Sequence, residues 1–84
     1  MPMHQTADLS RKKYEARVYN EWVRLLIDTG ELNVTGFADA WADSRLIEVE
    51  ARSIAEAMAK LQRDYPEGAG FKVAAIMELP AEQA

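Results

Sequence analysis

The chain has 84 residues, 49% of them hydrophobic and 29% charged, which is typical of one small globular domain and not of a disordered segment. It carries 14 acidic and 10 basic residues, and the resulting net charge of −4 disfavours non-specific binding to nucleic acid. The absence of cysteine excludes disulfides and thiol chemistry. The longest unbroken apolar run, 73–77, is too short to span a bilayer, so we expect one cytoplasmic domain over residues 1–84 without membrane association.

Residues 1–8 and 80–84 are expected to be loose tails, because neither carries a periodic apolar pattern. His4, the only histidine, lies in the first of them. A zinc site needs several His or Cys ligands, so the sequence predicts no metal site and no cofactor.

The segment 9–29 has an apolar side at helical spacing, and Gly30 follows it where a helix often ends. We therefore predict a helix over 9–29. The alternative is a strand over 13–19, where apolar and charged residues alternate until the alternation breaks at Tyr19 and Asn20. The apolar side of the predicted helix consists of Tyr14, Val18, Tyr19, Trp22, Val23, Leu25, Leu26 and Ile27.

The segment 32–41 is apolar in part and has no helix cap, and Gly36 suggests a bulge within a strand. The turn-forming residues 42–44 follow it, so we expect a hairpin between this segment and a strand that begins at Arg45. The alternative is one helix running from Ala38 to Tyr65, along which apolar residues also share a face.

The stretch 45–79 predicts strand, helix, strand. Residues 45–51 alternate, and Ser53 and Glu56 have the spacing of a capping box, which marks a helix start. Residues 71–79 alternate again until Pro80. One side of this last strand is expected to carry Phe71, Val73, Ala75, Met77 and Leu79.

These elements predict a small two-layer α+β domain, in which about three antiparallel strands pack against two helices in the order α-β-β-α-β. Two helices cover one face of such a sheet, so the other face, with Leu46, Ala74 and Ile76, needs another partner. A second copy of the chain is the expected partner, and we predict a homodimer.

The sequence favours a protein without enzymatic activity. The loop 68–70 is glycine-rich, but it follows a helix and precedes a strand, the reverse of a phosphate-binding loop. Glu48 and Glu50 have the spacing of any solvent-facing strand, and no serine has a His–acid couple to activate it. An enzyme subunit or small-molecule binder would instead require a deep pocket near Trp22 or Trp41.

We therefore predict a module that binds another protein, because an aromatic side chain rimmed by charges is a usual composition of a binding hot spot. The candidate contact residues are Phe37, Asp39, Trp41, Asp43 and Arg45. The alternative is a nucleic-acid-associated regulator, or an acidic inhibitor of a nucleic-acid-binding protein. The regulator would use the basic residues Arg11, Lys12, Lys13, Arg17 and Arg24, and its binding would be sensitive to salt.

Overall fold

The computed structural model describes residues 11–80, so the expected tails, apart from Pro80, and His4 lie outside the described residues. The elements in chain order are β1 (Lys12–Asn20), α2 (Glu21–Asp28), the 3₁₀ turn η1 (Asp39–Ala42), β2 (Arg45–Ala51), α3 (Ile54–Asp64), the 3₁₀ turn η2 (Glu67–Ala69) and β3 (Phe71–Glu78).

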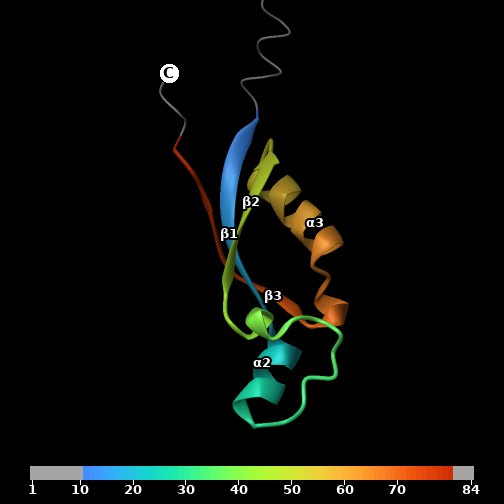
Figure 1. Cartoon of the computed structure of the whole chain (residues 1–84). Helices are drawn as coiled ribbons and strands as arrows, with labels where there is room; N and C mark the ends of the chain where they lie inside the picture. The colour runs from blue at the N-terminus through green and yellow to red at the C-terminus, as the bar shows by residue number, and fades with distance from the viewer. Residues whose placement is uncertain (1–10, 81–84) are drawn as a thin grey trace, which may run out of the picture.

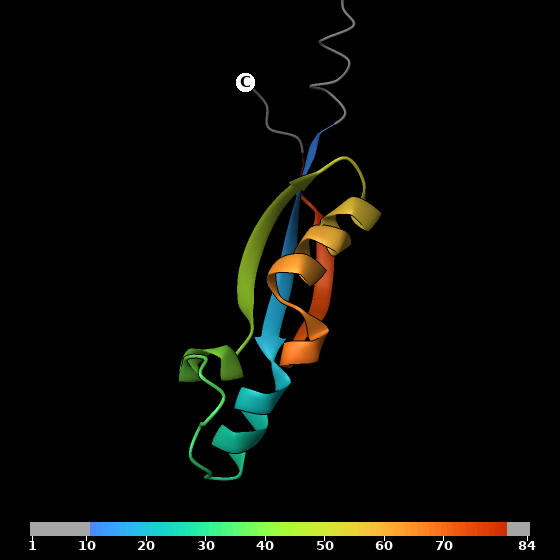
Figure 2. The same cartoon turned by 90° about the vertical axis from the view of Figure 1, so that its right-hand side faces the viewer.

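Within this part of the chain the strands form one antiparallel sheet in the order β2-β1-β3 (Figure 1). Helix α3 lies against one face of the sheet, and α2 continues from the end of β1 beyond the sheet (Figure 2). The predicted α+β class, with three antiparallel strands and two helices, is confirmed. The predicted order is wrong at its start, because the first element is a strand.

The predicted helix over 9–29 is wrong in its first half, where β1 is the central strand of the sheet. Tyr14, Ala16 and Val18 of β1 are buried towards α3. β1 pairs with β2 on one side and with β3 on the other. These long-range partners satisfy its backbone groups on both sides, and a local helical pattern contains no information about them. The alternative strand over 13–19 is therefore the correct interpretation.

The predicted hairpin between 32–41 and the Arg45 strand is also wrong. β2 pairs with β1, and η1 occupies the end of the segment expected to be a strand. Asn33 organises the loop: its Nδ2 donates to the Phe37 carbonyl at 2.8 Å, and its Oδ1 accepts from the Thr35 amide at 3.1 Å. These local side-chain bonds replace strand pairing. Gly36 adopts φ +89°, a left-handed turn conformation.

The capping box at the start of α3 is confirmed, which rules out a continuous helix over 38–65. Ser53 Oγ accepts a hydrogen bond from the Glu56 amide at 3.1 Å. Glu56 Oε1 in turn accepts from the Arg52 amide at 2.6 Å, one residue before the cap. Both bonds fix the point at which the chain leaves β2 and enters α3.

The core lies between the sheet and α3. One group of buried residues joins β1, α3 and the start of β3, and a second joins β1, the end of β2 and α3. The first group is Ala16, Val18, Leu61 and Phe71, and the second is Tyr14, Ala51 and Ala57.

A bulge interrupts the pairing of β1 with β3. Arg17 is opposite Ala75 but Val18 is opposite Val73, so Ala74 has no partner in the register. Such an extra residue changes which face of the sheet the following side chains point to. The predicted single row on β3 is therefore wrong. The core side carries Phe71, Val73 and Ile76, and the opposite side carries Ala75 and Met77.

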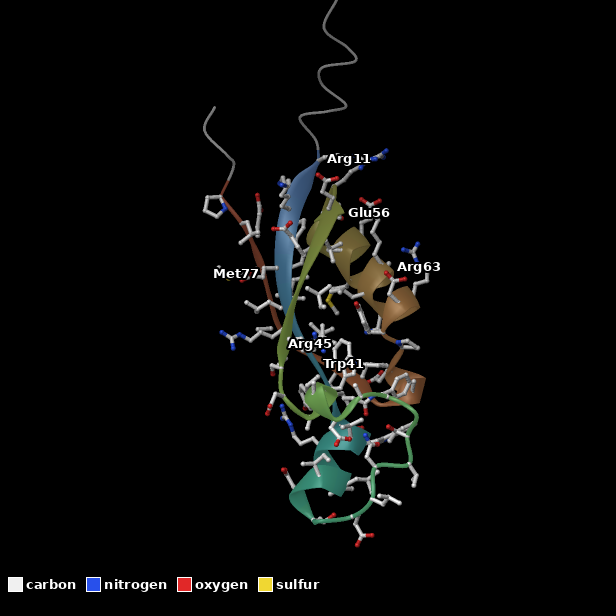
Figure 3. All side chains as sticks on the ribbon, in the orientation of Figure 1. Arg11, Trp41, Arg45, Glu56, Arg63 and Met77 are labelled. Atoms are coloured by element: carbon white, nitrogen blue, oxygen red, sulfur yellow. The ribbon has the colours of Figure 1, made fainter. Side chains whose placement is uncertain are left out.

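The sheet face opposite α3 is not covered by any helix of residues 11–80 (Figures 1 and 2). Leu46 lies exposed there, as expected, whereas Ile76 packs on the core side instead. Met77 points away from α3 on this face (Figure 3). The face also carries a like-charge pair, because Glu15 of β1 is directly opposite Glu48 of β2.

Candidate protein-binding surface

The two aromatic residues predicted to bind a partner mainly close the end of the core. Phe37 and Trp41 are half-buried, and their ring centroids lie 4.9 and 5.2 Å from that of Phe71 in edge-to-face geometry. Tyr65 joins the same cluster at 5.5 Å from both Trp41 and Phe71. Such edge-to-face pairs stabilise a core beyond the area they bury.

The charged members of the predicted site lie around η1. Asp39 Oδ1 accepts a hydrogen bond from Asn33 Nδ2 at 2.7 Å, so it takes part in the loop structure. The Arg45 guanidinium lies over the Trp41 ring at 5.0 Å from its centroid (Figure 3). Asp43 is exposed at the end of η1. The fold thus brings all five predicted residues to one end of the sheet, with the rings facing inward.

The basic residues of the nucleic-acid alternative are dispersed. Arg11 and Lys12 are near the start of β1, where they face Glu50 at 3.7 Å and Glu78 at 4.0 Å. Arg24 lies in α2: its Nε donates to the Ala42 carbonyl at 2.7 Å, and its guanidinium stacks 3.7 Å from the centroid of the Tyr19 ring.

Lys13 and Arg17 lie on the uncovered sheet face, separated along β1 by Glu15. The five basic side chains therefore do not form one continuous basic surface.

Five large apolar side chains are exposed on α2 and on the loop that follows it, among them the three most exposed of residues 11–80. They are Trp22 at 45% exposure, Leu25 at 61%, Ile27 at 40%, Leu32 at 81% and Val34 at 76%. We call these five residues the α2-end surface. Sequence reasoning missed it because it placed Trp22, Leu25 and Ile27 on the buried side of a long helix.

The composition of α2 is the sequence signal that could have revealed this surface. Five of its eight residues are large and apolar, yet only Val23 is buried. A helix this short cannot bury apolar side chains around most of its circumference against one neighbouring sheet. A shallow hollow of about 480 Å³ lies on its outer side. It is lined by Glu21, Trp22, Arg24, Leu25 and Asp28, all from α2, so it is an open surface and not an enclosed cleft.

Among residues 11–80, two side chains, Lys72 and Glu56, have a pKa shifted from its ordinary value. A hydrogen bond to Glu67, at 3.0 Å, together with the nearby Glu21, raises the pKa of Lys72. The hydrogen bond from the Arg52 amide lowers the pKa of Glu56. Within residues 11–80, no group of three or more His, Cys, Asp or Glu side chains is placed to hold a metal ion.

Neither helix among residues 11–80 has the length and apolar character needed to cross a membrane. Comparison of the chain with protein-family models, with curated proteins and with solved structures gave no significant match. The geometry of the described residues is therefore the basis for a functional proposal.

Proposed function

We propose that this protein is a non-catalytic module that binds another protein and that also associates with itself. The observation that carries the proposal is the α2-end surface, five large apolar side chains exposed on one short helix and its following loop. Burial of a side chain of this kind contributes roughly 1.5–3 kcal/mol, so covering two of them is a substantial driving force for association.

The exposed charges around this surface are acidic. Glu21, Asp28 and Glu31 are exposed beside the apolar residues, whereas the Arg24 guanidinium is already engaged by Tyr19 and the Ala42 carbonyl. An apolar centre with a charged rim is the usual anatomy of a protein interface.

The test is capture of binding partners from the native cell with the whole chain as bait. The variant carries Leu25→Glu and Leu32→Glu, two exposed positions whose change leaves the core intact. The matched control is Ile54→Glu, which alters an apolar residue of α3 that is also half exposed. The proposal expects specific partners with the wild type and with the Ile54 control, and their loss with the double variant.

Equal capture of partners by all three baits would show that the α2-end surface does not bind them. Circular dichroism of each bait, recorded before capture, shows whether the variant has kept the helical and strand content of the wild type. If a bait keeps the wild-type helical and strand content and still fails to capture a partner, the change in its surface is the cause.

A further inference from the structure

The net negative charge of the chain is concentrated in the segment 21–44, which forms α2, the loop after it and η1. This segment carries five acids and one basic residue, so its net charge of −4 equals that of the whole chain. The remainder of the chain carries nine acids and nine basic residues. The segment lies at one end of the sheet and also contains the α2-end surface (Figures 1 and 2). The five acids are exposed, and they are Glu21, Asp28, Glu31, Asp39 and Asp43.

Most of these carboxylates are not compensated by a basic side chain of the described chain. Glu21 lies 3.8 Å from the Lys72 ammonium. The other four acids form no ion pair within residues 11–80. Arg24, the basic residue of the segment, directs its guanidinium to the Ala42 carbonyl and the Tyr19 ring. The end of the molecule that exposes the most apolar surface is therefore also its uncompensated acidic end.

The hollow on the outer side of α2 brings the apolar residues and the acids together. Trp22 and Leu25 line it together with Glu21 and Asp28. Glu21 lies one helical turn before Leu25 and Asp28 one turn after it, so this exposed leucine is flanked by carboxylates along the helix. Glu31, whose amide donates to the carbonyl of residue 26 at 2.8 Å, continues the acidic rim beyond the end of α2.

We propose that the α2-end surface binds a basic amphipathic segment of another protein. An apolar side chain of that segment packs on Trp22 and Leu25, and lysines or arginines beside it pair with Asp28 and Glu31. This inference rests on the proposed function and names the chemistry of the partner. Charge complementarity carries the choice, because opposite charges across an interface speed association and oppose partners of the wrong sign.

The same charges disfavour the other occupants of such a surface. Nucleic acid and the anionic surface of a membrane have the same sign of charge as the segment 21–44. A second copy that met this surface about a two-fold axis would bring each acid towards its own counterpart, and like charges repel. The acids therefore favour a basic partner over a second copy at the α2-end surface.

The test measures the binding of two designed peptides to the whole chain. Both are amphipathic helices of about 18 residues with leucine along one side, and the other side is lysine in the first peptide and glutamate in the second. The proposal expects the lysine peptide to bind more tightly by about tenfold or more. In NMR spectra, this peptide should shift the amide signals of Trp22, Leu25 and Asp28 and leave those of β2 in place.

A matched pair of variants separates recognition by this surface from general attraction to an acidic protein. Asp28→Asn with Glu31→Gln neutralises two acids at the α2 end, and Glu15→Gln with Glu48→Gln neutralises two on the uncovered sheet face. Each variant removes the same charge, and neither breaks an ion pair of residues 11–80. We expect the first variant to weaken binding of the lysine peptide by about fivefold or more, and the second by less than about twofold.

The contrary results are distinct from failure of the proposed function. No binding of the lysine peptide, equal affinity for the two peptides, or equal weakening by the two variants would overturn the basic partner. If the capture experiment still lost its partners with Leu25→Glu and Leu32→Glu, protein binding at this surface would stand. Light scattering of the same variants tests the second copy. A dimer that tightened on neutralising Asp28 and Glu31, with peptide binding unchanged, would assign the surface to self-association instead.

Discussion

Gly70 lies directly against the side chain of Asn20, at the junction of β1, α2 and β3. A Cβ added to Gly70 would lie 2.8 Å from Asn20 Oδ1 and 2.7 Å from Cδ2 of Trp22. Asn20 is fully buried and holds the junction together: its Oδ1 accepts from the Trp22 and Val23 amides at 3.0 and 3.1 Å. Its Nδ2 donates to the Ala69 carbonyl at 3.0 Å.

Substitution Gly70→Ala is expected to lower the free energy of unfolding by about 2–4 kcal/mol. The added methyl group would overlap Asn20 and Trp22, and the backbone has φ +99°, which favours glycine. The matched control is Gly36→Ala, where φ is +89° but no atom lies within 4 Å of the added Cβ. The control isolates the cost of a left-handed backbone at an alanine, about 1–2 kcal/mol. Equal shifts of the two urea midpoints would contradict close packing at Gly70.

Substitution Asn20→Ala should destabilise the fold by roughly 2–4 kcal/mol, because it removes a helix cap and leaves buried amide and carbonyl groups without partners. Ser53→Ala removes the exposed cap of α3 and should cost only about 0.5–1 kcal/mol. Chemical denaturation of both variants measures the difference. Similar losses in the free energy of unfolding for the two variants would show that the burial of Asn20 does not add to the stability it provides as a cap.

Arg24 links α2 to η1, so Arg24→Ala should loosen the segment 29–44. Loss of the bond to the Ala42 carbonyl and of the stacking on Tyr19 is expected to cost about 1–2 kcal/mol. Limited proteolysis and amide exchange in this segment report the effect. Arg17→Ala, an exposed substitution on β1, is the control. Unchanged cleavage between 29 and 44 in the Arg24 variant would be evidence against the link.

The Glu56 capping interaction is expected to depend on pH. Its pKa is lowered from the ordinary 4.5 by the Arg52 amide, so the stability that the charged form adds is complete above about pH 4.5 and is lost as the pH falls through the lowered pKa. Glu56→Gln keeps an acceptor oxygen without the charge. Wild type should therefore be the more stable at pH 7, and the difference should close in acid.

Denaturant midpoints between pH 3 and pH 7 test this expectation, with Ser53→Ala as the comparison. That variant breaks the same capping box without removing a titratable group, so its deficit should stay nearly constant across the range. A Glu56→Gln deficit that persisted unchanged at pH 3 would show that the charge of Glu56 contributes no stability.

The candidate binding surface could be predicted only in part. An aromatic group among charges was expected around Trp41, and the residues do lie at one end of the sheet, but Trp41 packs against Phe71 and Tyr65. The more exposed Leu25 and Leu32 were assigned to other roles, because exposure depends on which neighbouring elements reach a residue. The composition of α2 indicates that some of its apolar residues stay exposed, but no pattern within it identifies Val23 as the one that is buried.

Signals contained within a few neighbouring residues determined much of the fold from the sequence alone. The Ser53–Glu56 capping box, the alternation of 45–51 and the stop at Pro80 each depend on local backbone chemistry, and the structure retains all three. Only the tertiary structure decided that 12–20 is a strand, that 32–41 is a loop ending in η1 and that Ala74 forms a bulge. These outcomes depend on β1 pairing with two strands distant in sequence, and the energy of that pairing is absent from any local window.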